Sequence, residues 1–558
     1  MNKRACLLAI ISALWFGHVE ADVSIKNGNF FIAYTDVRYT SGLKLKIERV
    51  YNSKSPFLGM FGWGWGMEYE SYLVPLPDGT VILHEFGGGA ANVFIPESPA
   101  QMDIDGAIAA LFGGTIPVDR PEYVARLRQD PTFRQEELEA AIDAGRLKPP
   151  HPAAGSAFVS LRFGYQRLER MADGYRRSSI RSTEDYTAAG QLRAITDPSG
   201  NSIRFEYPQT GEAGKRWPPS RIADNQGHVL TLNADSRGRV LRIQTADGKA
   251  ARYRYNVHNE LVFSVDVDGN TFAYSYDEGH RHNLVAIGYD DQTTLRIDYA
   301  SRAQHENVRS VQDRNGLLSA YRYTVDQRGD TEHLLVGIDI TDAQDRAVSK
   351  STYEYFIRKT KQKTWTERLI QTVDGERTDT TFSECCQTPI KVVRGRNTVQ
   401  LTYDDRGRVV AKTEQGESTR VQYDDAAGKA SRVTVKRPGG RPLVTSFRYD
   451  SRGNALAISD SIGRRVQLAY DSRGLVSQIA TPSITAFFTY NDESKPTEIS
   501  VKGKGGMSIS YRDNGEIDKT ENRGPTDLPL RIAEAVRYMN DLIRRADVSE
   551  GASTRREN

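Results

Sequence analysis

Two histidines and one acidic segment have residue types and spacings that suggest a metal site. His280 and His282 alternate along the chain, so both imidazoles would lie on one face of a strand. No nearby cysteine or carboxylate cluster completes the ligand set, and we expect an exposed loop instead. Asp266-x-Asp268-Gly269-Asn270 resembles the start of a calcium loop, but its glycine comes too early and no glutamate stands at the twelfth position. We therefore predict a hairpin turn there.

The signatures of hydrolytic and nucleotide chemistry are also missing. The sequence contains no Gly-x-Ser-x-Gly, and Gly87-Gly88-Gly89 stands between apparent strands instead of opening a helix before a lysine. The acidic pairs Asp404-Asp405 and Asp424-Asp425 recur with the repeat described below, which indicates a structural role. We therefore predict no catalytic, cofactor-binding or metal-binding residues, no cofactor and no enzymatic activity.

The cysteines are too few for a disulfide framework. Cys6 precedes the apolar run of the N-terminal segment, and beyond that segment only the adjacent Cys385 and Cys386 remain. Two neighbouring cysteines either close a strained ring or stay as thiols in a strand or loop. A four-cysteine zinc site is excluded by the count.

The charge distribution argues against a nucleic-acid partner. Seventy-five basic residues face 72 acidic ones, for a formal net charge of +3, and the arginines alternate with aspartate and glutamate. A polyanion groove requires basic residues gathered on one face. We expect solvated strand faces instead.

The first 21 residues are predicted to be a secretory signal peptide. Asn2-Lys3-Arg4 is a charged start, Ala5 to Phe16 an apolar run, and Val19-Glu20-Ala21 a cleavage site before Asp22. The run is too short to span a membrane, so no transmembrane segment is expected after cleavage. The mature chain is predicted to be secreted, periplasmic or at the cell surface.

A tyrosine recurs at nearly constant intervals and defines the elements of the chain. In the C-terminal part four of five gaps are 20 or 21 residues long, and the tyrosines are Tyr403, Tyr423, Tyr449, Tyr470, Tyr490 and Tyr511. Earlier pairs such as Tyr255 and Tyr276 keep this period, which predicts an array over 156–525. Regular repeats of this length are typical of stacked supersecondary units.

Each repeat is predicted to be a β-hairpin. In Tyr470-Asp471-Ser472-Arg473-Gly474 the polar residues and the glycine favour a turn. An apolar side chain stands two residues before the tyrosine, as Leu468 does here, so both lie on one face of a strand. Since one hairpin cannot bury that face, we expect stacked hairpins to form a mainly β, curling sheet or open spiral, with tyrosines stacking on their neighbours.

Tyr403-Asp404-Asp405-Arg406-Gly407 and Tyr449-Asp450-Ser451-Arg452-Gly453 resemble the YD repeats of the Rhs family. Arg49-Val50-Tyr51-Asn52-Ser53 and Gly59-Met60-Phe61-Gly62-Trp63-Gly64-Trp65 resemble the domain that opens Rhs-type proteins, which we assign to residues 22–96. The matches cover about four fifths of the chain. The resemblance implies a β shell that often encloses a toxic C-terminal domain, released by cleavage at an Asp-Pro-x-Gly motif.

Two segments interrupt the β pattern. Residues 97–155 are predicted to be a helical insert with a Pro-rich linker: Asp130 caps a helix that stops before Gly145, and Pro121 opens a shorter one. Residues 526–558 are predicted to hold an amphipathic helix and a disordered end. The apolar stripe of that helix is formed by Ile532, Val536, Met539 and Ile543. We favour packing of this stripe on the chain's own hairpins over docking of a partner.

The chain departs from the container plan that the resemblance implies. Asp197-Pro198-Ser199-Gly200 lies early in the array and matches an ordinary repeat turn, and about forty residues follow the last repeat, too few for a toxin domain. We therefore predict an exported, non-enzymatic scaffold that binds a partner protein or a glycan through its aromatic-rich strands. The alternative is a toxin-free component of an Rhs-type delivery system that carries a separately encoded effector.

Overall fold

The computed structural model describes residues 21–39, 42–87, 89–160, 166–179, 182–197, 200–208, 217–279, 281–360, 364–384, 386–425, 428–491, 494–511 and 517–546. The predicted signal peptide therefore lies outside the described residues, apart from Ala21. Its cleavage remains a prediction.

The N-terminal strands form a small sheet of their own, which we call the inner sheet. Its four antiparallel strands follow the order β1-β2-β3-β6, and a two-stranded β4–β5 hairpin adjoins it. The strands are β1 (Ala21–Ser24), β2 (Asn29–Arg38), β3 (Lys46–Asn52), β4 (Leu58–Gly59), β5 (Gly62–Trp63) and β6 (Trp65–Met67). Buried and half-buried residues alternate along β2 and β3, as expected for strands with one face in the core.

The rest of the sheet is one antiparallel ladder in which each strand pairs with the next along the chain. It begins with β7 (Tyr72–Pro75), β8 (Val81–Glu85) and β9 (Ala90–Pro96). It crosses to β10 through the β9–β10 pairing, in which Phe158 stands opposite Pro96. Its first half continues with β10 (Ala157–Ser160), β11 (Gln166–Arg170), β12 (Gly174–Ser178), β13 (Thr183–Thr187), β14 (Leu192–Thr196), β15 (Ser202–Glu206), β16 (Arg221–Asp224), β17 (Val229–Ala234), β18 (Val240–Thr245), β19 (Ala250–Tyr255), β20 (Leu261–Val265), β21 (Thr271–Tyr276), β22 (Leu284–Tyr289), β23 (Thr294–Tyr299) and β24 (Val308–Gln312).

The second half of the ladder opens with longer strands and returns to short ones. The strands are β25 (Leu318–Arg328), β26 (Thr331–Thr341), β27 (Ala347–Lys359), β28 (Thr364–Val373), β29 (Glu376–Phe382), β30 (Pro389–Arg394), β31 (Asn397–Tyr403), β32 (Val409–Glu414), β33 (Glu417–Asp424), β34 (Lys429–Lys436), β35 (Leu443–Tyr449), β36 (Ala455–Asp460), β37 (Arg465–Tyr470), β38 (Val476–Ala480), β39 (Thr485–Tyr490), β40 (Pro496–Val501), β41 (Gly505–Tyr511) and β42 (Ile517–Asn522).

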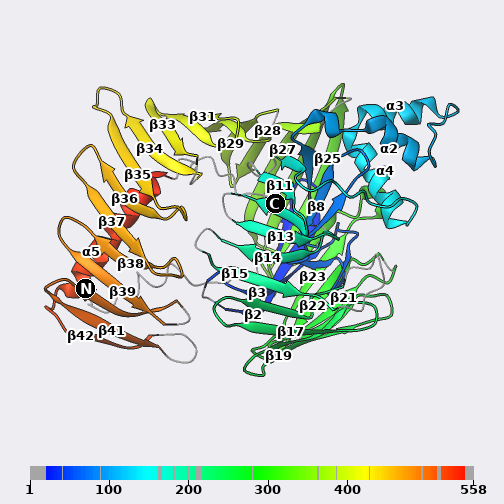
Figure 1. Cartoon of the computed structure of the whole chain (residues 1–558). Coiled ribbons are helices and arrows are strands. Elements are labelled where there is room, and N and C mark those ends of the chain that lie inside the picture. Colours follow the sequence, from blue (N-terminus) through cyan, green and yellow to red (C-terminus); the bar gives the residue numbers. More distant parts are fainter. Residues whose placement is uncertain are drawn as a thin grey trace.

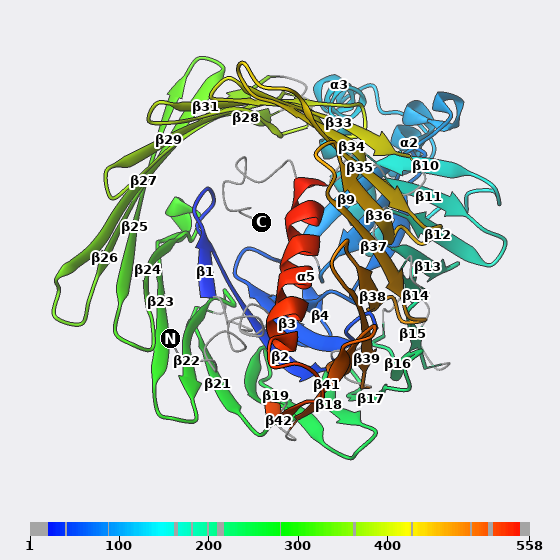
Figure 2. The same ribbon diagram turned by 90° about the vertical axis from the view of Figure 1, so that its left-hand side faces the viewer.

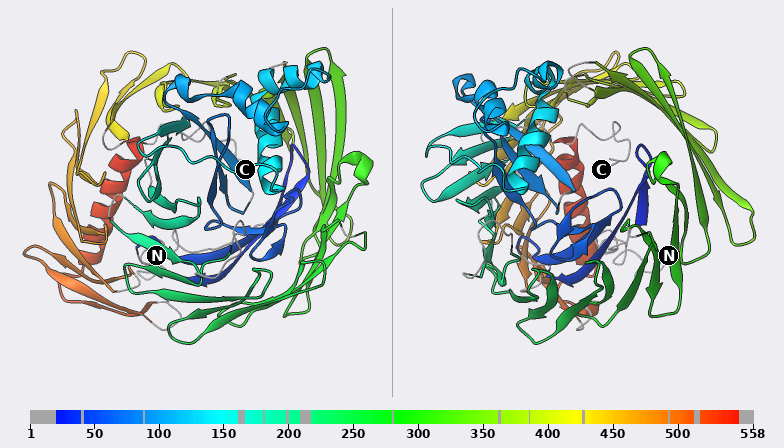
Figure 3. Two further views of the ribbon diagram at one scale, coloured as in Figure 1. Left: turned by 45° about the vertical axis from the view of Figure 1, so that its right-hand side comes forward. Right: turned by 90° about the vertical axis from the view of Figure 1, so that its right-hand side faces the viewer.

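The ladder winds into an open spiral. Figures 2 and 3 show its strands arranged around an interior that contains the inner sheet and the C-terminal helix. A single bridge between Tyr72 and Gln191 ties the β7 end to the segment between β13 and β14. We call the face turned toward the interior the inner face. The predicted mainly β fold, a curling sheet or open spiral of stacked hairpins, is confirmed.

The hydroxyl of each repeat tyrosine makes a hydrogen bond to the backbone. It donates to a backbone carbonyl earlier in the chain, across 2.7 to 3.1 Å. Tyr470, for example, donates to the carbonyl of Ala455, and Tyr490 to that of Val476. The predicted stacking of each tyrosine on its neighbours stays a prediction. The phenol satisfies a carbonyl that would otherwise be buried alone.

The residue after the tyrosine builds the turn. Asp450 Oδ1 accepts the N–H groups of Arg452 and Asn454, and Asp450 Oδ2 accepts the side-chain amide of Asn454. Gly453 between them has a φ of 78°, in the left-handed region that glycine adopts without strain. Asp404 and Asp471 accept the corresponding backbone N–H groups. Tyrosine and aspartate therefore have separate tasks: one joins hairpins and the other closes them.

Three α-helices occupy the predicted insert. They are α2 (Ile104–Leu111), α3 (Pro121–Gln129) and α4 (Pro131–Asp143), after a short 3₁₀ turn, η2 (Pro99–Gln101). Asp130 accepts the N–H of Phe133 at 3.0 Å, which confirms the predicted cap of α4. The helix α2 was not predicted. Together α2 and α4 pack on the outward side of β7 and β8, through Ala107 and Leu138 (Figure 1).

The C-terminal helix α5 (Leu528–Ile543) lies on the inner face of the last strands (Figure 2) and continues into η4 (Arg544–Ala546). Another short 3₁₀ turn, η3 (Arg302–Gln304), precedes β24. No helix among the described residues is both long enough and apolar enough to cross a membrane.

Candidate functional site: the inner face of the spiral

The residues that suggested metal chemistry serve other tasks. His282 Nδ1 lies 2.8 Å from Glu260 Oε1, and its ring packs on Trp63 with centroids 4.4 Å apart. His280 lies outside the described residues. Asp266 Oδ1 accepts the N–H groups of Asp268 and Asn270, so this segment is the predicted hairpin turn. Within the described ranges no group of three His, Cys, Asp or Glu side chains is placed to hold a metal ion.

The acidic pair at 404 and 405 is likewise part of a turn. Asp404 Oδ2 accepts from Arg408 Nε at 2.8 Å, and these contacts, together with backbone donors, hold the pKa of Asp404 below its ordinary value against the opposing effect of burial. Asp425 of the next turn pairs with Arg406 at 2.9 Å. Neighbouring turns are therefore linked by ion pairs between arginine and aspartate side chains.

The described parts of the remaining sequence candidates lie in turns. Cys386 is disulfide-bonded, whereas Cys385 lies outside the described residues. The turn at 197–201 is closed by Asn201, whose N–H and side-chain amide both donate to Asp197, while 198 and 199 are outside the described ranges. Gly87 approaches Gly66 so closely that a Cβ on it would lie 2.6 Å from that residue's Cα.

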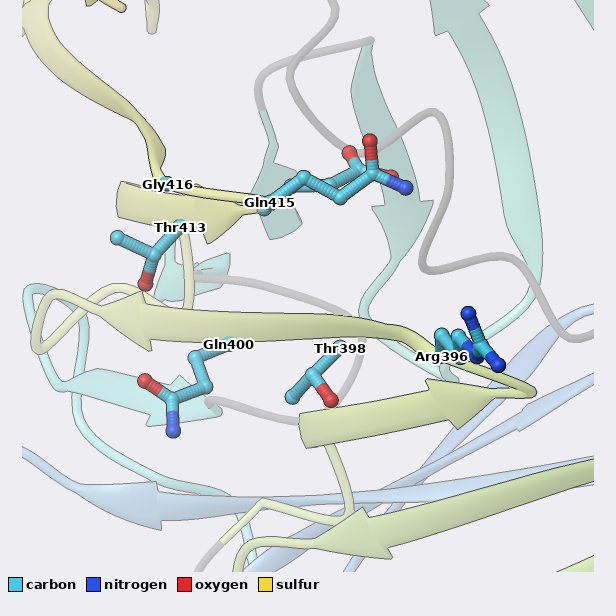
Figure 4. Close-up of a pocket in the computed structure, with 7 residues that line it drawn as sticks. Arg396, Thr398, Gln400, Thr413, Gln415 and Gly416 are labelled. Carbon is cyan, nitrogen blue, oxygen red and sulfur yellow. The ribbon is translucent and has the colours of Figure 1, made fainter. Parts of the chain in front are cut away.

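A small polar notch on the turns of β31 and β32 has a volume of about 320 Å³. Figure 4 shows Gln400 and Thr413 on adjacent strands and Arg396 and Gln415 at the turns. Glu414, in its wall, accepts from Asn397 and pairs with Lys412, and these contacts lower its pKa. The Glu414 carboxylate of the notch is thus already paired.

The inner face is the surface on which the chain places its own segments. Tyr34 and Tyr51 of the inner sheet reach the ladder through their hydroxyls: Tyr34 bonds the hydroxyl of Tyr289 at 2.8 Å, and Tyr51 donates to the carbonyl of His282 at 2.7 Å. Trp65 donates its indole N–H to Tyr276 at 2.9 Å. Polar atoms of the inner sheet therefore end on hydroxyls and carbonyls of successive repeats.

An ion pair lies at the centre of this contact. Arg49 and Asp36 are both fully buried and bond through two atoms each, at 2.5 and 2.8 Å. Burial acts to lower the pKa of Arg49, but the Asp36 carboxylate and the nearby tyrosines raise it well above its ordinary value. The sequence indicated Arg49 only as part of a family motif and gave no sign of its partner.

A half-buried acid beside the inner sheet, Glu70, has no cationic partner among its described contacts. Glu70 accepts the backbone N–H of Met60 at 2.7 Å and that of Met67 at 3.1 Å. Burial raises its pKa to about 8, although both backbone donors oppose this shift. No sequence pattern distinguished this residue.

At the other end of the ladder, α5 occupies the inner face. Its buried residues are Leu528, Ile532, Ala535, Met539 and Leu542. They pack on inner-face side chains of β33 to β41, such as Phe447, Leu468 and Ile499. The stripe therefore lies on the chain's own hairpins, as favoured, but it includes Leu542 in place of the predicted Ile543, which is 38% exposed.

Comparison with known proteins places these features in a family. The Teneurin YD-shell family matches residues 178–520, more than half of the chain, and a domain of unknown function, DUF6531, matches residues 21–92. The toxin protein Tse5 of Pseudomonas aeruginosa is 22% identical over 483 residues, which are 82% of this chain and 31% of Tse5. The chain thus spans about a third of this relative's length.

Solved structures show more distant likeness. The crystal structure of TcdB2-TccC3-TEV is 11% identical with a TM-score of 0.39, covering 93% of this chain and 25% of that one. The Photorhabdus luminescens Tc holotoxin pore is 10% identical with a TM-score of 0.25, covering 86% of this chain and 36% of that one.

The predicted Rhs-type YD-repeat assignment is confirmed by the family match and by Tse5. This chain belongs to the Teneurin YD-shell family.

Proposed function

We propose that this chain is an exported, non-enzymatic YD-shell scaffold that holds a protein partner on its inner face. The observation that supports it is the placement of two segments of the chain itself, the inner sheet and α5, on that face. They come from opposite ends of the described chain and use different elements. A surface that accommodates both a sheet and an amphipathic helix is suited to binding polypeptide.

The repeat tyrosines favour a protein partner on the inner face over a glycan on the outer face of the spiral. The repeat tyrosines are half-buried, and their hydroxyls bond backbone carbonyls. Their rings therefore help to build the wall, and the aromatic contact area that glycan binding would use is not offered by these residues on the outer face. Glycan binding is the version of the proposal that this arrangement supports least.

Site-specific photo-crosslinking tests this proposal. Leu530 is 59% exposed on the side of α5 that faces away from its hairpins, while Gln400 is exposed in the notch of Figure 4. A photo-reactive phenylalanine at position 530 is expected to capture a protein in the native host, and the same group at position 400 is not. Capture at 400 alone would overturn the proposal. N-terminal sequencing of the exported chain, expected to begin at Asp22, tests the export step.

A second candidate function is a component that carries a separately encoded effector. The 22% identity to the toxin protein Tse5 over 82% of this chain favours it. Coexpression with the protein encoded by the adjacent gene, followed by native mass spectrometry, is expected to give a complex in which that protein resists protease. A freely cleaved neighbour would remove this candidate and leave the scaffold proposal in place.

A further inference from the structure

The inner sheet and the β4–β5 hairpin that adjoins it are joined to the spiral by backbone hydrogen bonds at four places. The N–H groups of Val240, Val267 and Val308 donate to the carbonyls of Met60, Asp36 and Gly28, at 2.8, 3.2 and 2.9 Å. In the opposite direction Trp63 donates to the carbonyl of Asn259 at 2.9 Å. These contacts extend from β18 to β24, so one small sheet touches a succession of repeats.

The approach is so close that glycine is required at two of the contacts. A Cβ on Gly28 would lie 2.5 Å from the Cβ of Asn307, and one on Gly62 would lie 2.5 Å from the carbonyl oxygen of Asn259. Both glycines have positive φ, 64° and 91°. The chain therefore approaches the wall too closely at these two points for a side chain larger than that of glycine.

The buried ion pair lies within this contact and uses groups from both sides. Arg49 and Asp36 belong to the inner sheet, and the ladder supplies three hydroxyls. Tyr253 donates to Asp36 Oδ2 at 2.7 Å, while Ser264 and Tyr274 accept from the Arg49 guanidinium at 3.1 and 3.3 Å. Each hydroxyl comes from a different strand, β19, β20 or β21.

Aromatic rings enclose the same guanidinium. Its central carbon lies between 5.0 and 6.0 Å from the ring centroids of Tyr34, Phe61, Trp65, Tyr253 and Tyr274. Asp36 is able to face it because a register shift between Thr35 and Val37 forms a bulge in β2 at this residue. A charge in such surroundings is tolerated only when every partner is in place.

We propose that the Arg49–Asp36 pair is a positioning lock that sets how the spiral seats on the inner sheet, and that the inner sheet thereby acts as the template for the curvature of β18 to β24. A shift of one residue in seating would leave the guanidinium or the carboxylate buried without the hydroxyls of β19 to β21. The lock selects one seating because all other seatings leave a buried charge unsatisfied. This role rests on the proposed function, because the lock would fix the shape of the interior against which a protein partner packs.

Hydrogen exchange with mass spectrometry tests the lock on the full chain without any partner. The amides of Val240, Val267 and Val308 report seating directly, while peptides from β36 to β39 report the wall elsewhere. In Arg49→Met the three seating amides are expected to exchange at least tenfold faster, and β36 to β39 to stay unchanged. In Asp36→Leu/Arg49→Met the thermal midpoint is expected to recover toward the wild type while the seating amides remain fast.

The outcomes separate positioning from general stability. Wild-type exchange of the three amides in the double variant would overturn the lock, and so would uniform acceleration over the whole chain in the single variant. The matched control is Lys46→Met/Glu48→Leu, which removes a half-exposed pair from the same strand and is expected to leave the three amides unchanged.

Should Arg49→Met fail to fold, Tyr274→Phe removes one hydroxyl of the lock and is expected to accelerate the same amides by a smaller factor. Uniform acceleration in that variant would equally overturn the proposal. Because no partner takes part, failure of the lock is distinguishable from failure of the proposed function, which the crosslinking experiment decides.

Discussion

At the scale of single residues, the tyrosine and the aspartate of the repeat have different tasks. The tyrosine hydroxyl satisfies a backbone carbonyl of an earlier hairpin, and the following aspartate caps its own turn. The fourth residue after the aspartate adds a further contact, because Arg408 both donates to Asp404 and lies over the ring of Tyr423 at 4.3 Å. Hydrogen bonds of the tyrosine and the aspartate thus recur in every one of these turns.

Removing one repeat hydroxyl tests this assignment. Tyr470→Phe deletes the donor to the Ala455 carbonyl and is expected to lower the free energy of unfolding by about 1 kcal/mol. Urea denaturation of the wild-type and variant chains measures the change. Tyr323→Phe is the matched control, because the Tyr323 hydroxyl is buried with no hydrogen-bond partner among the described residues. Equal losses in both variants would contradict the assignment.

Glu70 predicts a pH dependence with a defined sign. Its pKa is raised by burial to about 8 from an ordinary value of 4.5, so the folded chain holds this proton where the unfolded chain releases it. The stability that protonated Glu70 contributes to the folded chain is fully present below about pH 4.5 and is lost as the pH rises to about 8. The thermal midpoint of the wild type is therefore expected to fall relative to that of Glu70→Gln over this range.

The comparison with Glu70→Gln isolates one group, because the variant does not titrate at this position. A control substitution on the surface, Glu498→Gln on β40, is expected to leave the pH profile of the wild type unchanged. A constant difference between the wild type and Glu70→Gln across the range would show that the carboxyl is not held in its neutral form.

At the scale of elements, α5 is an internal ligand of its own sheet. Five buried apolar residues face the hairpins, Tyr538 accepts the N–H of Arg465 at 3.1 Å, and Arg545 lies 3.4 Å from Asp460. Polar contacts are few, so burial of apolar side chains supplies most of the attachment.

Shortening one of those side chains is expected to release the helix locally. Ile532→Ala removes a side chain that is 5% exposed and is expected to cost about 2–4 kcal/mol of local stability. Hydrogen exchange of residues 528–543 should accelerate strongly in this variant, with β18 to β24 unaffected. Leu530→Ala, at an exposed position of the same helix, is the control, and a comparable acceleration there would contradict the packing.

At the scale of the whole molecule, the two halves of the spiral are stabilised differently. Strands β17 to β24 contact their neighbours and also the inner sheet, whereas β34 to β42 contact their neighbours and α5. In a ladder of repeats, each unit depends mainly on its nearest neighbours, so additional contacts produce regional stability.

Native-state hydrogen exchange is therefore expected to show higher protection in β18 to β24 than in β36 to β41. Arg49 and the backbone bonds of Val240, Val267 and Val308 supply the difference. Uniform protection over both halves would indicate that the inner sheet adds no stability to the wall. A low concentration of urea should enlarge the difference, because the less protected half opens first.

The sequence predicted the features that depend on residues close together along the chain. The tyrosine period, the turn residues and the cap of α4 at Asp130 are local signals, and each appears in the structure as expected. The short helix α2 escaped prediction because its first turn contains Gly106, which weakens the helical pattern even though Asp103 caps it. In α5 the predicted stripe was wrong at its end because periodicity does not distinguish Leu542 from Ile543.

The long-range contacts gave no signal. Asp36 finds Arg49 through a bulge, and their hydroxyl partners lie more than two hundred residues away along the chain. Glu70 is distinguished only by the burial that the assembled interior imposes. These features depend on how distant segments meet, which no local pattern encodes.

The enclosed position of the inner sheet sets an order of events in synthesis. Residues 28 to 63 are made before Val240, Val267 and Val308, which lie in the segments that surround them. This earlier segment must therefore wait, without its final partners, until Val308 has been made. If such a chain crosses a membrane unfolded and with its N-terminus first, the inner sheet arrives on the far side before the strands that wind around it.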